Sequence, residues 1–149
     1  MRVYLDNCCY NRPYDDQSQI RVFLEAHAKM YIQYLIKTGV LELVSSYTLT
    51  YEISRNPSEI IKESILSFIN ENTSFFVDAS MSDKVSTLAE IIMKTGIKRA
   101  DAHHVASAII ANCEYLITTD DRLLKYQSER IRIVSPTEFI RIIGGADNV

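Results

Sequence analysis

The sequence predicts a three-layer α/β/α domain with a central parallel sheet of four to five strands, and two observations support this prediction. Short apolar runs rich in strand-forming residues alternate with longer segments whose apolar residues recur at helical spacing. The chain also has no internal repeat, low-complexity tract or linker-like stretch. Strands that alternate with helices of this length form βαβ units, whose helices cover both faces of a parallel sheet.

Turn and capping signals locate the expected elements. Residues 11–13 interrupt the chain after the first strand. Gly39 and Gly96 stand where two helices should end, because glycine commonly closes a helix C-terminus. Ser46 is the expected N-cap of a short helix. The expected strands are residues 2–6, 40–45, 74–77, 115–118 and 131–134, and the expected helices are residues 18–38, 46–55 and 100–112, with others that start near 57, 80 and 136.

The helix expected at residues 18–38 carries an apolar stripe that is rich in tyrosine. We expect this stripe to pack in the core, and a dimer interface is the alternative use. Its members recur at helical spacing. They are Ile20, Phe23, Leu24, His27, Tyr31, Tyr34 and Leu35.

Size and composition favour one domain spanning residues 1–149, since 149 residues of which 47% are apolar can form a real core. No apolar run approaches the about 18 residues that a membrane-spanning helix needs. The first residues include a charge and no cleavage site for a signal peptidase, so we expect a cytoplasmic protein. Three cysteines, two of them adjacent, are typical of reduced thiols rather than disulfides.

The net charge of −3 argues against simple non-specific binding of nucleic acid, which usually requires a basic protein. It argues less against an enzyme, because bound metal neutralises part of the acidic charge. Glycine-rich phosphate loops are also absent, since none of the four glycines stands at a strand-to-helix turn. A P-loop or dinucleotide-binding enzyme is therefore not expected.

Four acidic residues are expected near one edge of the sheet. Asp6 ends the first strand, Asp120 follows the fourth, and Asp101 starts the helix that leads into the fourth. Glu52 lies on the helix after the second strand. Ligands of open parallel sheets bind outside the carboxyl ends of the strands. Four carboxylates there would repel one another unless a cation were present, and hard divalent ions prefer oxygen ligands.

Each of these residues also has an ordinary structural interpretation. Asp101 could simply complement the dipole of its helix. Asp120 or Asp121 could cap the short helix that follows, and an error of one residue in register would exchange the two as candidates. Glu52 could be a solvated helical residue. Spacing alone leaves these alternatives open.

The ordered set of motifs resembles the PIN-domain family of nucleases, which includes the toxins of many bacterial and archaeal toxin–antitoxin pairs. The motifs are a first strand ending in Asp6, a helix with Glu52, an Asp-Ala pair at Asp101 and a strand running into Thr-x-Asp at Asp120. The resemblance spans roughly residues 2–140. After Asp6 the chain departs from the family pattern, because residues 7–13 replace the usual Thr or Ser.

The resemblance implies a metal-dependent endoribonuclease. One or two Mg²⁺ or Mn²⁺ ions would be held by Asp6, Asp101, Asp120 and Glu52, with Glu52 as a direct ligand or the holder of a metal-bound water. RNA cleavage would leave a 5′-phosphate and a 3′-hydroxyl. An antitoxin partner and a homodimer are also implied. The alternative is a catalytically inactive PIN-like domain that serves as a binding module.

Further residues are candidates for holding the substrate or the ligands. Thr118 could orient a carboxylate through its hydroxyl, and Asn7 could bind a phosphate or a metal-bound water. Arg12, Lys98 and Arg99 could grip the RNA backbone, although each could equally be a solvated surface charge. His103 and His104 lack the spacing of a zinc site, so we expect packed or hydrogen-bonded histidines.

Overall fold

The computed structural model describes residues 1–145 and contains one five-stranded sheet in the order β3-β2-β1-β4-β5. Every neighbouring pair of strands is parallel. This confirms the predicted α/β fold class with a central parallel sheet. The strands are β1 (Arg2–Leu5), β2 (Glu42–Ser46), β3 (Thr73–Val77), β4 (Tyr115–Ile117) and β5 (Arg132–Val134).

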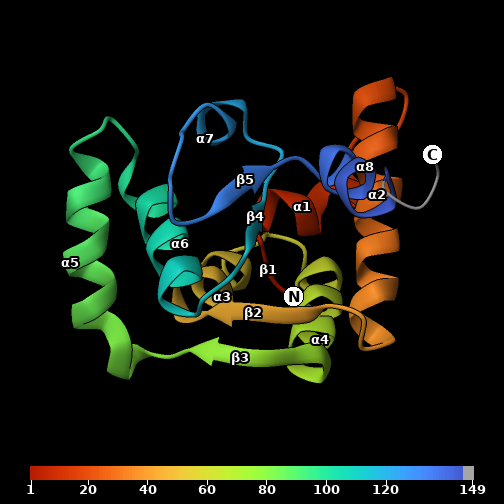
Figure 1. Cartoon of the computed structure of the whole chain (residues 1–149). Coiled ribbons are helices and arrows are strands. Elements are labelled where there is room, and N and C mark those ends of the chain that lie inside the picture. The colour runs from red at the N-terminus through yellow and green to blue at the C-terminus, as the bar shows by residue number, and fades with distance from the viewer. Residues whose placement is uncertain (146–149) are drawn as a thin grey trace.

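The helices connect these strands and form the outer layers. Right-handed crossovers place the helices between β1 and β3 on one face of the sheet and those between β3 and β4 on the other. Figure 1 shows α2 beside α8 at one side and α5 beside α6 at the opposite side. The helices are α1 (Asn7–Asn11), α2 (Ile20–Lys37), α3 (Tyr47–Ser54), α4 (Glu59–Asn72), α5 (Ser82–Met93), α6 (Arg99–Ile110), α7 (Asp121–Leu124) and α8 (Pro136–Gly145), with 3-10 turns η1 (Arg12–Tyr14) and η2 (Ala79–Met81).

The strand order creates a switch point between β1 and β4. The chain runs outward from β1 to β2 and β3, and then crosses back to β4 on the other side of β1. Helices that leave the carboxyl ends of β1 and β4 therefore diverge to opposite faces and open a crevice there. Within residues 1–145, no helix is long and apolar enough to cross a membrane.

The central strands and one face of each main helix form the hydrophobic core. β1 and β4 are buried along their apolar residues, whereas the edge strand β3 leaves Phe76 exposed. Gly39 and Gly96 adopt φ values of +82° and +101° just beyond α2 and α5. These two glycines therefore end helices as predicted, since other residues rarely adopt this conformation.

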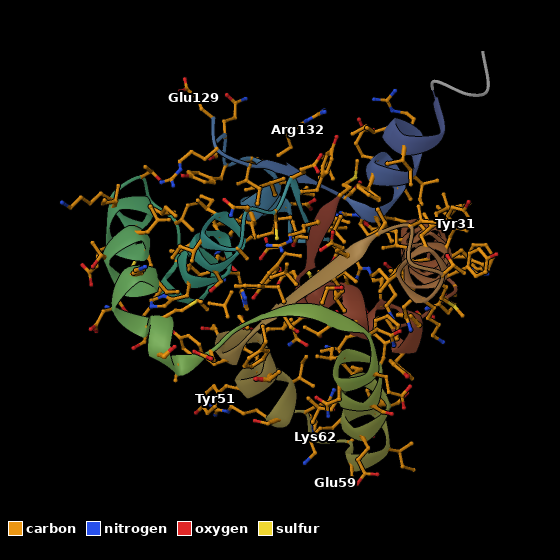
Figure 2. The ribbon with its side chains drawn as sticks, turned by 60° about the horizontal axis from the view of Figure 1, so that its bottom comes forward. Tyr31, Tyr51, Glu59, Lys62, Glu129 and Arg132 are labelled. Carbon is orange, nitrogen blue, oxygen red and sulfur yellow. The ribbon has the colours of Figure 1, made fainter. Side chains whose placement is uncertain are left out.

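The sequence analysis chose the wrong face of α2 as the core face. Most of the apolar stripe is exposed, including Ile20 at 77% and Tyr34 at 58%. Figure 2 shows Tyr31 projecting away from the body of the protein. The buried face instead carries Val22, Ala26, Ile32, Leu35 and Ile36 together with Glu25 and Lys29. Two charged residues interrupt this face, so its apolar pattern is weaker than that of the exposed stripe.

The segment after Asp6 also differs from the prediction. The sequence indicated a break at residues 11–13 and no helix before it, whereas α1 begins directly at Asn7 with Asp6 as its N-cap. The 3-10 turn η1 follows and contains Pro13. A five-residue helix is too short to give a periodic pattern, and its capping residue had been interpreted only as the end of a strand.

We expect the two faces of α2 to respond differently to substitution. Ile32 is fully buried, so Ile32→Ala should lower the free energy of unfolding by about 2–5 kcal/mol. Tyr34→Gln on the exposed stripe should change it by no more than about 0.5 kcal/mol. Urea denaturation measures both values, and comparable losses in the two variants would contradict the assignment of the faces.

Candidate active site

Asp6 is held firmly at the carboxyl end of β1 and is only 5% exposed. Its backbone N–H donates to the carbonyl of Ile117 at 3.0 Å, which extends the pairing of β1 with β4. One carboxylate oxygen accepts from the Asn7 backbone N–H at 2.8 Å, and the other accepts from the Thr118 hydroxyl at 2.8 Å. The Cys8 thiol donates to the second oxygen at 3.4 Å. The carboxylate is therefore oriented by donors on both neighbouring segments.

Thr118 links Asp6 to Asp120. Its hydroxyl oxygen accepts from the Asp120 backbone N–H at 3.1 Å while the hydroxyl donates to Asp6. The Asp120 carboxylate accepts from the Arg122 backbone N–H at 2.8 Å and thereby caps α7. The capping role considered for Asp120 is thus present, and it fixes this carboxylate beside the end of β4.

Asp121, the rival of Asp120, is turned elsewhere. Its carboxylate forms two hydrogen bonds with the Arg21 guanidinium, at 2.8 and 3.0 Å, on the exposed surface. Arg21 consequently lowers the pKa of the Asp121 carboxyl. Asp121 is therefore paired with Arg21 of α2. Of Asp120 and Asp121, it is Asp120 whose negative charge acts on Asp101.

Asp101 lies in the first turn of α6 and is partly buried. Burial raises the pKa of its carboxyl, and the negative charges of Asp6 and Asp120 raise it further. Asp6 and Asp120, which lie far from Asp101 in the sequence, are therefore close enough to act on its carboxyl near the switch point of the sheet. The prediction that four carboxylates share one metal site remains a prediction.

His104 is the central polar residue beneath these carboxylates and is only 1% exposed. Its Nε2 is hydrogen-bonded to Glu52 and lies 3.8 Å from an oxygen of Asp6. Its Nδ1 lies 2.6 Å from the hydroxyl of Tyr4. The expectation of a hydrogen-bonded histidine is confirmed, but its contact with two predicted site residues was not foreseen.

The hydrogen-bonded chain continues from Tyr4 into α3. The Tyr4 hydroxyl lies 2.7 Å from the Ser46 hydroxyl, which accepts from the Leu49 backbone N–H at 3.1 Å and caps α3. α3 also carries Glu52, so the network starts and ends on the same helix. An ionised Glu52 can only accept, so Nε2 of His104 carries the proton between them.

The charge of His104 depends on opposing influences. Burial lowers the pKa of the imidazole, whereas the hydrogen bond to Glu52 and the negative charges of Asp6, Glu52 and Asp101 raise it. The net effect is a raised pKa. The neighbouring carboxylates therefore favour the protonated form of His104 more than burial disfavours it.

The donor set fits a hard divalent cation, because the three aspartates offer only oxygen ligands. In the positions that the side chains take, no three His, Cys, Asp or Glu residues among residues 1–145 enclose a metal ion. Glu52 is turned to His104, and Asp120 is turned to the start of α7.

A hollow of about 240 Å³ opens beside Asp101 and is bordered by cationic side chains. Lys98, Arg122 and Lys125 line it, and all three are exposed. None of the three forms an ion pair within the described part of the chain. Lys98 was predicted from the sequence, whereas Arg122 and Lys125 were not, although the two lie three residues apart just after Asp120.

The remaining predicted residues occupy varied positions. The Arg12 guanidinium is engaged with Glu25 at 2.8 Å and Asp15 at 3.1 Å. The Asn7 side-chain oxygen accepts from Asn11 at 3.0 Å. Arg99 is exposed at the start of α6. Of the cationic candidates, the structure therefore places Lys98 at the hollow and holds Arg12 in ion pairs.

Comparison with known proteins identifies the fold. No protein-family model and no curated protein matches the chain. Solved structures do match. VapBC2 from Rickettsia felis, bound to a DNA fragment from their promoter, has a TM-score of 0.54 and 16% identity and covers 89% of this chain and 97% of that chain. FitAcB from Neisseria gonorrhoeae has a TM-score of 0.55 and 16% identity, with 90% and 97% covered.

A third structure, FitAB bound to an IR36 DNA fragment, has a TM-score of 0.58 and 15% identity, with 91% of this chain and 95% of that chain covered. At such identities the likeness concerns the fold. The parallel five-stranded sheet with helices on both faces is consistent with the PIN-like fold that the motifs predicted.

We expect Asp101→Asn to stabilise the metal-free protein at neutral pH. Because the pKa of Asp101 is raised on folding, the folded state binds this proton more tightly, and stability falls as pH rises above about 4, the ordinary aspartate value. Thermal unfolding in EDTA should therefore give a higher midpoint for the variant at pH 7, and the two midpoints should converge as pH falls toward that value.

Asp121→Asn is the matched control for this measurement. Arg21 lowers the pKa of Asp121, so its ionised form favours the folded state and its removal should give no gain at pH 7. If Asp101→Asn were no more stable than wild type at pH 7, the carboxylates would not repel one another as the geometry requires.

Proposed function

We propose that this chain is a metal-dependent endoribonuclease that hydrolyses RNA phosphodiester bonds. The observation that carries the proposal is the convergence of Asp6, Asp101 and Asp120 at the switch point between β1 and β4. Carboxylates that repel one another are costly to hold together, so their convergence favours a site for a cation. The resemblance of the sequence motifs to PIN-domain nucleases supports the same reading.

Mg²⁺ or Mn²⁺ would be held by Asp6, Asp101 and Asp120, with Glu52 as a ligand or as the holder of a metal-bound water. When bound, one or two such ions supply a water of lowered pKa and offset the charge that develops on the phosphate. Thr118 keeps the Asp6 carboxylate oriented, and His104 keeps Glu52 at the same rim. Cleavage would leave a 5′-phosphate and a 3′-hydroxyl.

The cationic hollow would hold the RNA backbone. Lys98, Arg122 and Lys125 lie beside Asp101 and can pair with phosphate oxygens on one side of the scissile bond. Asn7 and Arg99, at the starts of α1 and α6, remain candidates for further contacts. Arg12 would have to leave its ion pairs with Glu25 and Asp15 to take part.

We further propose that the chain is the toxin of a toxin–antitoxin pair and that it works in the cytoplasm as a homodimer. The similar VapBC2 and FitAB structures contain DNA, which in the first comes from their promoter. The exposed apolar stripe of α2, including Phe23, Tyr31 and Tyr34, offers a surface that another chain could cover. Light scattering after gel filtration tests the dimer.

We expect Mn²⁺ to raise the thermal unfolding midpoint of wild type and to support cleavage of single-stranded RNA. A ligand present at a hundredfold excess over its dissociation constant stabilises the fold by about 2.7 kcal/mol, which is several degrees for a domain of this size. Asp6→Asn and Asp120→Asn should lose both effects. Asp121→Asn is the matched control and should keep them, because its carboxylate pairs with Arg21.

The unfolding and cleavage measurements together distinguish a missing metal site from a missing nuclease activity. A Mn²⁺ shift without cleavage of any RNA would keep the metal site and remove the nuclease. No shift and no cleavage would favour the alternative, a PIN-like binding module whose carboxylates have no metal to hold.

We also expect the cationic hollow to set the salt dependence of RNA binding. Each phosphate contact contributes about 0.7 to the slope of log affinity against log salt for single strands. Lys125→Gln or Arg122→Gln should therefore weaken binding and reduce this slope by somewhat less than one, with kcat little changed. Lys84→Gln, an exposed lysine near the start of α5 that does not line the hollow, is the control. Equal effects in all three variants would count against the hollow.

A further inference from the structure

A second, smaller cavity lies between α1, η1, α2 and α4 and encloses about 160 Å³. We call it the Lys29 pocket. Aromatic rings form much of its wall, and polar side chains line the rest. The residues that matter for its chemistry are Tyr10, Tyr14, Lys29, Gln33, Ser64 and Phe68. None of these is among the candidate residues of the active site.

Lys29 is buried in this pocket without a partner for its charge. The residue is 6% exposed, and its ammonium forms no hydrogen bond or ion pair with any residue among 1–145. The ammonium lies over the ring of Tyr10, whose centre is 5.4 Å from Nζ. Burial of an unpaired charge is costly, so a buried lysine normally has a carboxylate beside it.

The Tyr10 side chain adds a second unused donor. Its hydroxyl is buried and has no hydrogen-bond partner among the described residues. Nearly all buried hydroxyls have one, and each exception calls for an explanation. Tyr10 has no exposed surface, so the Lys29 ammonium is the unpaired donor that an acceptor entering the cavity could reach.

The charges around the pocket are positive. Burial lowers the pKa of Lys29 to about 8, Cys9 acts to raise it, and Lys37 lowers it further. The ammonium of Lys37 lies 5.8 Å from the centre of the Phe68 ring, which itself faces Tyr10. No carboxylate among residues 1–145 acts on Lys29, so an anion would meet no opposing charge.

Glu25 shows how the same helix face treats a buried charge that has a structural role. Glu25 is 3% exposed and lies one turn before Lys29 on α2. Its carboxylate is paired with Arg12 at 2.8 Å and with Arg21 at 3.4 Å. The fold thus compensates one buried charge fully and leaves its neighbour uncompensated, and this contrast argues that Lys29 is kept for a ligand.

We propose that the Lys29 pocket binds a small aromatic carboxylate. The carboxylate would accept from the Lys29 ammonium, while its ring would lie against Phe68 and Tyr14. One negative charge matches the single buried ammonium, whereas a doubly charged phosphate would remain partly uncompensated in a largely apolar cavity. The proposal does not depend on nuclease activity, because none of these residues touches the carboxylate site.

Benzoate and benzamide are the probes that test this proposal at pH 7, where most of Lys29 is protonated. They share shape and differ in charge. Benzoate added to the full chain should raise the unfolding midpoint and shift backbone amide NMR signals of α1, α2 and α4 around the pocket. Benzamide should do neither. An equal response to benzamide, or no response to benzoate, would overturn the proposal.

Lys29→Met separates binding from folding. It keeps most of the side-chain length and removes the charge, so the ligand-free variant should unfold at a higher temperature than wild type while binding benzoate at least roughly tenfold more weakly. Lys94→Met, at an exposed lysine, is the control and should bind as wild type does. Unchanged binding by Lys29→Met would overturn the proposal.

Inorganic phosphate distinguishes a general anion site from the proposed one. Benzoate should displace phosphate and bind more tightly, because only benzoate has a ring to place against the aromatic walls. Phosphate that binds as tightly as benzoate would exclude the aromatic carboxylate class.

Discussion

The burial of negative charge at the carboxyl ends of β1 and β4 is the constraint on which the arrangement of the site depends. Asp6 ends β1, caps α1 and accepts the hydroxyl of Thr118, so the ends of two strands and the start of a helix meet at one carboxylate. Asp101 can approach this group only at an energetic cost. Oriented donors to Asp6 and the imidazole of His104 beside it offset part of that cost.

The protein balances its buried charges in three different ways. The carboxylate of Asp6 is stabilised by hydrogen bonds from neutral donors, and Glu25 is stabilised by two guanidinium groups. Lys29 has neither kind of partner. The same fold supplies partners for the buried carboxylates of Asp6 and Glu25. The missing partner of Lys29 is therefore not explained by a general shortage of polar side chains in this part of the fold. The absence of a partner for Lys29 therefore suggests a function for this residue, which its buried surface area alone would not reveal.

The strands and the acidic rim could be predicted because their signals are local. Each strand is a short apolar run, and an aspartate at its end reaches the crevice wherever the strand lies in a parallel sheet. The His104 network could not be predicted, since its partners Glu52 and Tyr4 are 52 and 100 residues away. The core face of α2 was missed because Glu25 and Lys29 interrupt it, and the role of each depends on tertiary contacts.

The net charge of −3 describes the whole chain and does not give the charge of any one part of its surface. Interactions between exposed charges fade over about 8 Å at physiological ionic strength, so a phosphate group responds to the side chains nearest to it. At the proposed site those side chains are Lys98, Arg122 and Lys125, while several acidic residues are held in ion pairs elsewhere. An acidic chain can therefore present a cationic border beside Asp101, and the affinity for RNA proposed above would depend on that border rather than on the sum of the charges.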